Sequence, residues 1–400
     1  MRAVGIVCEY NPFHRGHLYQ IKALREIAGE DAAVVCAMSG DFVQRGEAAV
    51  FDKFARAEAA CRCGASLVLE LPLPWCLSSA EGFARGAVGL LGAMGSEAVC
   101  FGSESGKLEG LEQLAELLLD PAFNESVRAR LAREPNLSYA AARQSEAEAV
   151  IGDAAKLLER PNDILAVEYL KAVRTLGLSM RPLPVLRKGS GHDQNAMEGE
   201  TRSASEIRRR MAAGVSVEND IPAAAYAVYA RELEKGRAVL KTAALETAML
   251  SRLLLLSAED FAALPDAADG LENRLYRAVR ENGGLDAILT AAKTRRYALA
   301  RIRRLCLCAC LGVREGMAAG VPPYARVLAA DRKGRAWLRQ RSGEGEIPLV
   351  TKPAAVRALG ADSAALFMLG AHAHDLYTLG FGQRDGVLPD EDWRTGPRIV

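Results

Sequence analysis

The first hundred residues alternate between short apolar runs rich in β-branched residues and longer runs with helical spacing. The strand-like runs are 3–8, 32–38, 66–71 and 98–101, and the helix-like runs are 18–28, 51–63 and 80–91. Strands and helices that alternate in this way form βαβ units, in which neighbouring strands pair in parallel and helices cover the sheet. The sequence therefore predicts an α/β fold with a parallel sheet for the amino-terminal part of the chain.

The alternation changes along the chain and predicts two domains. Residues 108–155 are rich in Ala, Leu, Glu and Arg with helical periodicity, and a strand-like run at 180–186 restores the α/β pattern. Beyond Pro222 the runs are helix-forming as far as position 311, and the last hundred residues are mixed, with a short strand-like run at 347–350. We expect an α/β domain over 1–215 and a mainly α-helical carboxyl-terminal domain over 216–400.

The charge balance excludes a protein whose overall electrostatic field attracts nucleic acid or anionic lipid. The 400 residues include 51 Lys and Arg against 50 Asp and Glu, which gives a formal net charge of +1. Any site for a polyanion must therefore be a local patch. The 9 Cys are typical of reduced thiols in a core, because several lie inside apolar runs, and no run approaches the roughly 18 apolar residues of a membrane span. We expect a cytoplasmic protein without a membrane partner.

The sequence His-x-Gly-His follows the first strand directly, after an Asn-Pro turn and at the start of a helix. His14 and His17 then lie on one face of the first helical turn, where both donate hydrogen bonds and the unpaired helix N–H groups attract a triphosphate. Gly16 lacks a Cβ and allows an adenine ring to approach the backbone. The alternatives are cap or surface histidines, or a metal pair, but zinc requires further ligands. The pattern favours a nucleotide site, and we assign no metal ligand.

A second phosphate signal lies at 201–210, where Ser203 or Ser205 can cap a helix whose first turn carries Arg208. This segment resembles the Ser-x-x-Ile-Arg element of nucleotidyltransferases. A hydroxyl and a guanidinium there meet the β and γ phosphates as pyrophosphate leaves, a role that suits a fixed guanidinium fork. The alternative is an ordinary capped helix with a solvated basic face.

Five further segments occur in the order found in one bacterial family. They are Glu9-Tyr10-Asn11-Pro12-Phe13-His14, then residues 38–47, 63–72 and 101–104, and Arg160-Pro161-Asn162-Asp163-Ile164-Leu165. Together they resemble the tRNA(Met) cytidine acetate ligase family, clearly over residues 1 to about 210 and more loosely over the rest.

The resemblance implies a Rossmann-like nucleotidyltransferase domain with a parallel sheet. That domain would activate acetate with ATP, as acetyl-adenylate and pyrophosphate. The acetyl group would then pass to the exocyclic amine of the wobble cytidine of elongator tRNA(Met), which gives N4-acetylcytidine. The implied substrates and partners are thus ATP, acetate and this tRNA. Mg²⁺ is expected with the triphosphate, although no sequence motif supplies its ligands.

The resemblance also assigns site residues. The family's ATP contacts fall on Val7, Cys8, Glu9, Tyr10, Asn11, Pro12, Phe13, His14, Arg15, Gly16, His17, Leu18, Tyr19, Gln20, Gly102, Asn162 and Arg187, with Ser205 added from the second phosphate signal. We expect His14 and His17 to stabilise the triphosphate and its transition state, and Arg208 to steady the leaving pyrophosphate. Without the family match, Gly102 is a turn glycine, Asn162 a helix cap and Arg187 a solvated strand end.

Three other polar segments have open interpretations. A second wall of the site is predicted where a strand is followed by Ser39, Gly40 and Asp41. In this interpretation Gln44 and Arg45 contact substrate or tRNA. The alternative is a structural loop in which Asp41 caps a helix. His192 follows Gly191, where relatives often carry an aromatic residue, so no role is assigned to it. The resemblance likewise transfers no role to the pair His372 and His374.

The best local patch for RNA is 293–304, which holds six positive residues and no acidic one. The apolar spacing predicts a helix over 297–311. Contacts with tRNA phosphates are expected from Arg295 and Arg296, just before this helix, and from Arg303 and Arg304 on it. Tyr297 is then available for stacking on a base. The alternative is a solvated basic face.

Two other functions are consistent with part of this sequence pattern. A small-molecule adenylyltransferase of the His-x-Gly-His superfamily keeps the nucleotide site but needs neither the helical half nor its basic patch. A non-catalytic RNA-binding protein keeps the patch, but the intact His14, Gly16, His17 and Arg208 argue against the loss of catalysis.

Overall fold

The computed structural model of the chain describes residues 2–134, 137–187, 202–268, 270–341 and 347–400. His192 lies outside this part of the chain. No helix among the described residues is both long enough and apolar enough to cross a lipid bilayer.

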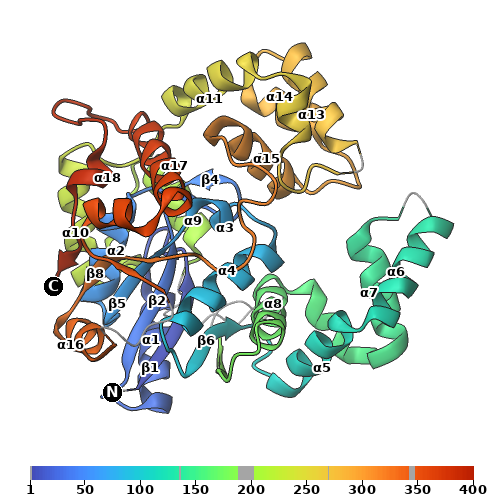
Figure 1. Cartoon of the computed structure of the whole chain (residues 1–400), viewed down its shortest axis with the longest axis horizontal. Coiled ribbons are helices and arrows are strands. Elements are labelled where there is room, and N and C mark those ends of the chain that lie inside the picture. The colour runs from blue at the N-terminus through green and yellow to red at the C-terminus, as the bar shows by residue number, and fades with distance from the viewer. Residues whose placement is uncertain (1, 135–136, 188–201, 269, 342–346) are drawn as a thin grey trace.

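One large sheet organises the molecule, with the strand order β10-β8-β5-β2-β1-β6-β7 (Figure 1). Its strands are β1 (Ala3–Cys8), β2 (Ala33–Ser39), β5 (Leu67–Leu71), β6 (Ala98–Ser103), β7 (Arg181–Leu186), β8 (Ala325–Ala330) and β10 (Arg398–Ile399), and β9 (Leu349–Val350) pairs with β8. The five strands from the amino-terminal half, in the order β5-β2-β1-β6-β7, are all parallel to one another, which confirms the predicted parallel α/β fold. Their carboxyl ends therefore meet at one edge of the sheet.

Helices follow the strands in the predicted rhythm. The first half contains α1 (Arg15–Ala28), α2 (Lys53–Arg62), α3 (Leu73–Cys76), α4 (Ala80–Ala93), α5 (Leu108–Leu119), α6 (Pro121–Arg133), α7 (Tyr139–Ile151), η1 (Gly152–Glu159), α8 (Pro161–Thr175) and α9 (Ala204–Ala212). The second half contains η2 (Glu218–Asp220), α10 (Ala223–Glu234), α11 (Ala243–Leu255), α12 (Ala258–Ala262), α13 (Leu271–Glu281), α14 (Leu285–Ala292), α15 (Leu299–Leu311), α16 (Arg332–Arg341), η3 (Pro353–Leu359), α17 (Ala361–Thr378) and α18 (Glu391–Arg394).

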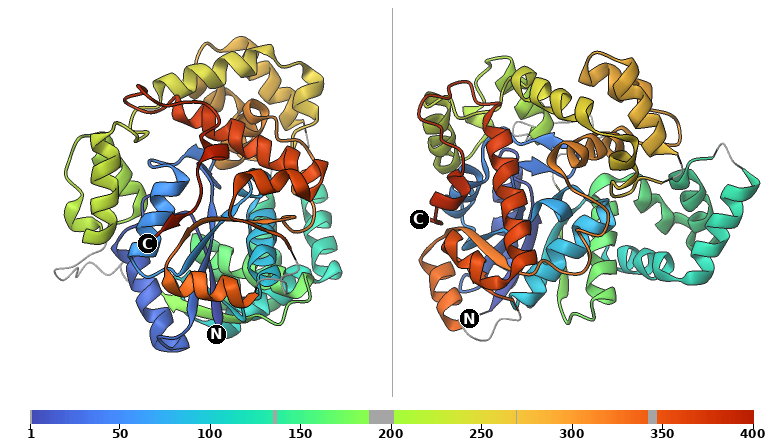
Figure 2. Two further views of the ribbon diagram at one scale, coloured as in Figure 1. Left: turned by 60° about the vertical axis from the view of Figure 1, so that its left-hand side comes forward. Right: turned by 45° about the horizontal axis from the view of Figure 1, so that its top comes forward.

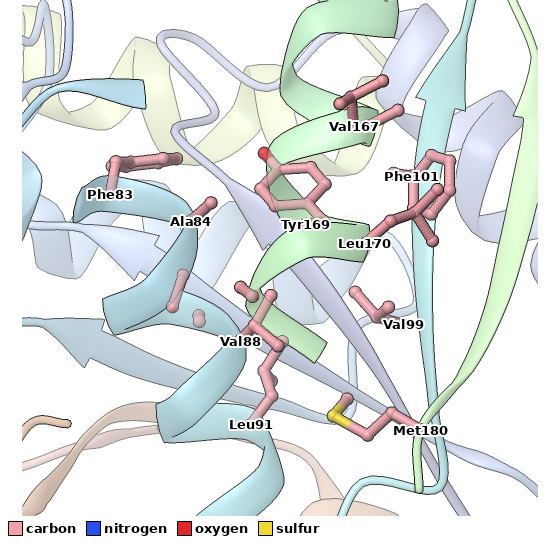
Figure 3. Close-up of a cluster of buried hydrophobic side chains, with 14 of the residues drawn as sticks. Phe83, Ala84, Val88, Leu91, Val99, Phe101, Val167, Tyr169, Leu170 and Met180 are labelled. Atoms are coloured by element: carbon pink, nitrogen blue, oxygen red, sulfur yellow. The ribbon is translucent and has the colours of Figure 1, made fainter. Parts of the chain in front are cut away.

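The central strands β1, β2 and β6 are buried on both faces, because nearly all of their residues are apolar. In β2, Val35 packs into a core with α4 and α8, whereas Val34 and Cys36 point to the opposite face and pack with α1, α2 and α10. Figure 3 shows the first of these cores. Alternation between the two faces follows from the period of two along a strand.

A group of helices, α11 to α15, packs around a third core beside the sheet (Figures 1 and 2). The hairpin of β3 (Phe42–Val43) and β4 (Glu47–Ala48) connects this group to the sheet, because Phe42 is buried among its residues. Gly46, at the turn of the hairpin, has a φ of +77°, and a Cβ there would lie 2.6 Å from the backbone nitrogen of Arg304 on α15. The glycine therefore allows both the turn and the close approach of α15.

The chain returns to the sheet after the helices, which the sequence analysis did not predict. Strand β8 pairs antiparallel with β5, and β10 pairs with β8. The strand reads Ala-Arg-Val-Leu-Ala-Ala, and its alanines and single arginine give a weak β signal. The helical prediction for the carboxyl-terminal half is thus confirmed for most of it, while its last segment forms an edge of the α/β sheet. The boundary near 215 stays a prediction.

A buried ionic cluster fastens this last segment to the sheet. The Lys53 Nζ lies 2.8 Å from Glu70 Oε1 and 2.6 Å from Asp392 Oδ2. The Arg326 Nη1 lies 2.9 Å from the other oxygen of Glu70 and 2.7 Å from Asp392 Oδ2. Two cations thus face two carboxylates in the interior, and removal of any one leaves an uncompensated buried charge.

His374 on α17 extends this cluster and is fully buried. Its Nδ1 lies 2.8 Å from Asp41 Oδ2, and its Nε2 lies 3.4 Å from Glu391 Oε2. Burial by itself lowers the pKa of the imidazole, but the two carboxylates outweigh burial and raise the pKa to about 10. His374 is therefore a charged structural residue, whereas His372 is exposed.

Replacement of His374 by Asn should remove a pH dependence of stability. A folded-state pKa above the unfolded value stabilises the protein fully below about pH 6.5. This stabilisation is lost as pH rises toward 10, by up to about 1.4 kcal/mol per pH unit. Urea unfolding between pH 6.5 and 9 should show this decline in the native protein and in a His372→Asn control, but not in His374→Asn. Equal slopes in all three proteins would contradict the assignment.

Candidate active site

The two histidines of the His-x-Gly-His segment are held as neutral hydrogen-bond donors. His14 is the N-cap of α1, and its Nδ1 accepts a hydrogen bond from the Gly16 N–H at 3.0 Å. The Nδ1 of His17 accepts from the His14 N–H at 3.2 Å. Because each Nδ1 is an acceptor, we infer that each ring carries its proton on Nε2.

Burial and mutual repulsion keep both imidazoles uncharged. The ring centroids of His14 and His17 are 3.8 Å apart. Burial lowers the pKa of His14 to about 4, helped by the positive charge of Arg187. Burial lowers the pKa of His17 well below its usual value, and His14 and Arg187 add to the effect. Two N–H donors thus remain neutral at physiological pH and add to the positive end of the α1 dipole.

Helix α9 forms with a serine cap as predicted, and the structure distinguishes its two serines. Ser203 is the N-cap, because its side chain accepts from the Glu206 N–H at 3.2 Å. The Arg208 guanidinium donates to the Asn11 carbonyl at 2.9 Å and lies 3.4 Å from Ser205 Oγ. The arginine is therefore held against the loop that joins β1 to α1.

The carboxyl ends of β6 and β7 form a further wall. The Glu104 carboxylate accepts hydrogen bonds from the backbone N–H groups of Asn162 at 3.1 Å and Asp163 at 3.0 Å. Asn162 also donates to Glu104 through its side-chain amide. The backbone N–H of Arg187 donates to the Ser103 carbonyl at 2.9 Å. Glu104 thus supplies the missing cap of α8 and fixes the position of Asn162.

In the segment between β2 and α2, some residues have a structural role and others line the candidate site. Asp41 is buried and accepts from the Lys53 N–H at 2.8 Å, so its role is the structural one that the sequence left open. The Gln44 N–H donates to Glu9 Oε1 at 2.7 Å. Gln44 and Arg45 line the cavity described next.

These walls enclose a cavity of about 220 Å³ at the carboxyl edge of the sheet. Residues assigned from the sequence that line it are Val7, Cys8, Glu9, Tyr10, Asn11, His17, Gln20, Gly102, Asn162, Arg187 and Arg208. The switch of strand order beside β1 is where open α/β sheets bind ligands. Segments far apart in the sequence thus supply one site.

Other assigned residues lie beside the cavity and not among its lining. They are Pro12, Phe13, His14, Arg15, Gly16, Leu18, Tyr19 and Ser205. Phe13 is fully buried, and its N–H donates to the Tyr229 hydroxyl at 3.0 Å. The Arg15 guanidinium donates to the Asn219 carbonyl. The Phe13 backbone and the Arg15 side chain thus hold the loop in place. A direct ATP contact, through these residues or through those of the lining, stays a prediction.

The cavity also has an apolar wall, which the sequence did not predict. Phe83 from α4, Leu165 and Tyr169 from α8, and Phe101 from β6 line it. The same rings pack in the core in Figure 3. The helical spacing of Phe83, Leu165 and Tyr169 signals only burial, as does the apolar strand that contains Phe101. No local motif indicates that one edge of this core borders a cavity.

The basic segment near α15 is less exposed than predicted. Arg295 and Arg296 are exposed, but Tyr297 is buried in the third core and is not available for stacking. The Arg303 Nη1 pairs with Glu47 Oε1 at 2.6 Å, and the Arg304 Nη1 donates to the Gln44 carbonyl at 3.3 Å. Contrary to the expectation, Arg303 turns toward the β3–β4 hairpin because that hairpin packs against α15.

The fold and the site together define a class of protein. A parallel sheet carries neutral imidazole donors after its first strand and an arginine from a later capped helix, as in a nucleotidyltransferase. The model of the HIGH Nucleotidyl Transferase family matches residues 1–386. The chain belongs to this family, and within it to the tRNA(Met) cytidine acetate ligases, as three comparisons show.

A tRNA(Met) cytidine acetate ligase of Syntrophotalea carbinolica is 40% identical over 362 residues, which cover 88% of this chain and 85% of the relative. One of Caldanaerobacter subterraneus subsp. tengcongensis is 34% identical over 390 residues, which cover 95% and 96%. Crystal structures of Thermotoga maritima TmcAL match over the full length of both chains at 30% identity, with TM-scores of 0.92 for the apo form and 0.89 for the form bound with alpha-thio ATP. The resemblance drawn from the sequence is confirmed.

Gly102 offers a test of the cavity. The three heavy atoms nearest to a Cβ at this position all belong to the Arg187 side chain, the first at 3.2 Å, so no backbone atom lies closer to it. Gly102→Leu should fill part of the cavity and weaken ATP binding at least about 10-fold, which corresponds to about 1.4 kcal/mol. Calorimetric titration with ATP measures this. A Gly283→Leu control, with open space around its Cβ, should bind as the native protein does. Unchanged affinity in Gly102→Leu would place the nucleotide elsewhere.

Proposed function

We propose that the protein is an ATP-dependent tRNA acetate ligase that acts through acetyl-adenylate on the wobble cytidine of elongator tRNA(Met). The observation that carries the proposal is the cavity at the end of β1, with its neutral imidazole and guanidinium donors. The match to Thermotoga maritima TmcAL bound with alpha-thio ATP supports a nucleotide there. The names of the relatives support the acid and the tRNA. As a ligase of this kind the protein forms a carbon–nitrogen bond.

In the first step an acetate oxygen attacks the α-phosphorus of ATP, and the bond to pyrophosphate breaks. Phosphoryl chemistry of this type requires positioning and charge stabilisation more than covalent help from the protein. The Nε2–H groups of His14 and His17 donate to phosphate oxygens as charge develops. Arg208, held by the Asn11 carbonyl, steadies the pyrophosphate as it leaves.

Magnesium fits this site as a companion of the triphosphate. No group of three His, Cys, Asp or Glu suited to a metal occurs among the described residues. Phosphate oxygens and water would therefore supply most of its ligands, as is usual for Mg²⁺ in nucleotide sites. When bound, the ion neutralises phosphate charge.

In the second step the exocyclic amine of the cytidine attacks the acetyl carbonyl, and AMP leaves. The tRNA must approach the edge of the sheet where the β3–β4 hairpin and α15 meet. Arg295 and Arg296, exposed just before α15, contact phosphates of the tRNA backbone. Arg303 and Arg304 join the hairpin to α15 and position this surface.

The whole reaction is tested with labelled ATP, with and without acetate and with and without unmodified elongator tRNA(Met). We expect AMP release that requires acetate and tRNA, with N4-acetylcytidine in the recovered RNA. AMP joined to a small phosphorylated acceptor would instead identify a metabolite adenylyltransferase. Binding of tRNA without any ATP turnover would identify a non-catalytic RNA-binding protein.

Replacement of His17 by Ala removes one of the two donors and should lower the rate of AMP formation by roughly 10²–10³-fold. A His372→Ala variant changes an exposed histidine on α17 and should keep the native rate. If His17→Ala forms AMP as fast as the native protein, the imidazole has no role in adenylate formation.

The double variant Arg295→Ala/Arg296→Ala should weaken tRNA binding. The slope of log affinity against log salt should fall by about 1 for each phosphate contact that is lost. Filter binding at several salt concentrations measures both quantities. An Arg128→Ala/Arg133→Ala variant on α6 changes the net charge equally and serves as the control. The same loss in both variants would mean that net charge, and not this surface, determines binding.

A further inference from the structure

Glu9 is the one carboxylate among the described residues that line the nucleotide cavity. The other charged groups of that lining are the guanidinium groups of Arg45, Arg187 and Arg208. The proposed substrates, ATP and acetate, are both anions. A carboxylate repels them, so its presence in this lining requires a separate explanation.

The surroundings of Glu9 hold it in place without neutralising it by a direct ion pair. It directly follows β1, and its Oε1 accepts the Gln44 N–H at 2.7 Å. Within the described part of the chain, no cation lies within ion-pair distance of Glu9. Burial raises the pKa of this carboxyl, although the hydrogen bond from Gln44 and the charges of Arg45, Arg56 and Arg208 oppose the rise.

The two steps of the proposed reaction differ in their need for a base. Acetate is already an anion when it attacks ATP, so adenylate formation requires no proton acceptor. The exocyclic amine of cytidine, in contrast, must lose a proton as its nitrogen bonds to the acetyl carbon. A fixed, partly desolvated carboxylate suits this task, because a base acts best when its pKa approaches the working pH.

We propose that Glu9 is the catalytic base of acetyl transfer, an inference that rests on the proposed function. The amine nitrogen attacks the carbonyl carbon of acetyl-adenylate and a C–N bond forms. The C–O bond to the phosphate of AMP breaks, and AMP leaves with the electron pair. The amine proton passes to a carboxylate oxygen of Glu9 and from there to solvent.

The arrangement of the cavity supports this role. Glu9 lies where the β3–β4 hairpin meets the end of β1, because Gln44 of the hairpin segment donates to it. His17 lies on α1, with its ring against His14 at the helix start. The carboxylate thus borders the wall that the hairpin and Arg45 form, and Arg45 is exposed to an approaching RNA.

The variant Glu9→Gln separates the two steps. Its side-chain carbonyl still accepts the Gln44 N–H, so the hairpin contact is kept while the base is lost. Hydroxylamine, a nucleophile that needs no enzyme base, traps acetyl-adenylate as acetohydroxamate and measures the first step. A single-turnover assay with elongator tRNA(Met) measures the second. We expect acetyl transfer to slow by roughly 10²–10⁴-fold, and hydroxamate formation to fall far less than acetyl transfer.

Two controls accompany this variant. Glu26→Gln changes an exposed carboxylate on α1 and should leave both steps at the native rate. Glu9→Asp keeps the carboxylate and should restore part of the transfer rate.

Three outcomes overturn the assignment. Equal losses in both steps of Glu9→Gln would make Glu9 a nucleotide-positioning residue. Native rates in both steps would leave it without a catalytic role. Failure of the native protein to form acetohydroxamate from acetate and ATP would instead refute the proposed function itself, whatever the behaviour of the Glu9 variants.

Discussion

The buried guanidinium of Arg56 is the interaction on which the rest of the site depends. Its Nε donates to the Phe51 carbonyl at 2.9 Å, and its Nη1 donates to the carbonyls of Glu9 and Ser39. Its Nη2 donates to Gly40. These carbonyls lie at or just beyond the carboxyl ends of β1 and β2, or just before α2, where the sheet ladder ends. Unpaired, each would cost about 1–3 kcal/mol in the interior. The Arg56 side chain thereby fixes the position of Glu9 relative to the segment that leads into the hairpin.

The carboxyl-terminal segment of the chain also holds this segment in place. Asp41 follows Gly40 directly and pairs with His374 of α17, while Lys53 and Arg326 share the carboxylates of Glu70 and Asp392. Contacts of this kind join residues more than three hundred positions apart. The last segment is therefore part of the α/β unit, and its loss would expose buried charges directly behind the wall of the cavity.

Local patterns were enough to predict the parts of the site that are local. The His-x-Gly-His segment follows β1, whose end the alternation locates, and a parallel sheet must bring that end to the same edge as the ends of its neighbours. Gly102, Asn162 and Arg187 were assigned through the family resemblance instead, and the structure places them in the lining of the same cavity. The predicted cap of α9 was correct, although two candidate serines satisfied the same pattern. Only the geometry shows that Ser203 caps the helix and that Ser205 lies beside Arg208.

Features that depend on long-range packing could not be predicted in this way. The direction of Arg303 is set by Glu47, which lies 256 positions away in the chain. Strand β8 forms because β5 offers a free edge and Glu70 and Asp392 accept the charge of Arg326, not because its own residues favour a strand. Phe83 and Tyr169 carry only the signal of a buried helix face, yet they border the cavity.

The central claim, that this cavity joins acetate to the adenylyl group of ATP, is tested most directly by ATP–pyrophosphate exchange without tRNA. Labelled pyrophosphate enters ATP only if the protein forms an adenylate reversibly, so the measurement isolates the first step. The account predicts exchange that requires acetate and that falls sharply in the His17→Ala variant. Exchange that is independent of acetate, or that persists unchanged in the variant, would contradict it.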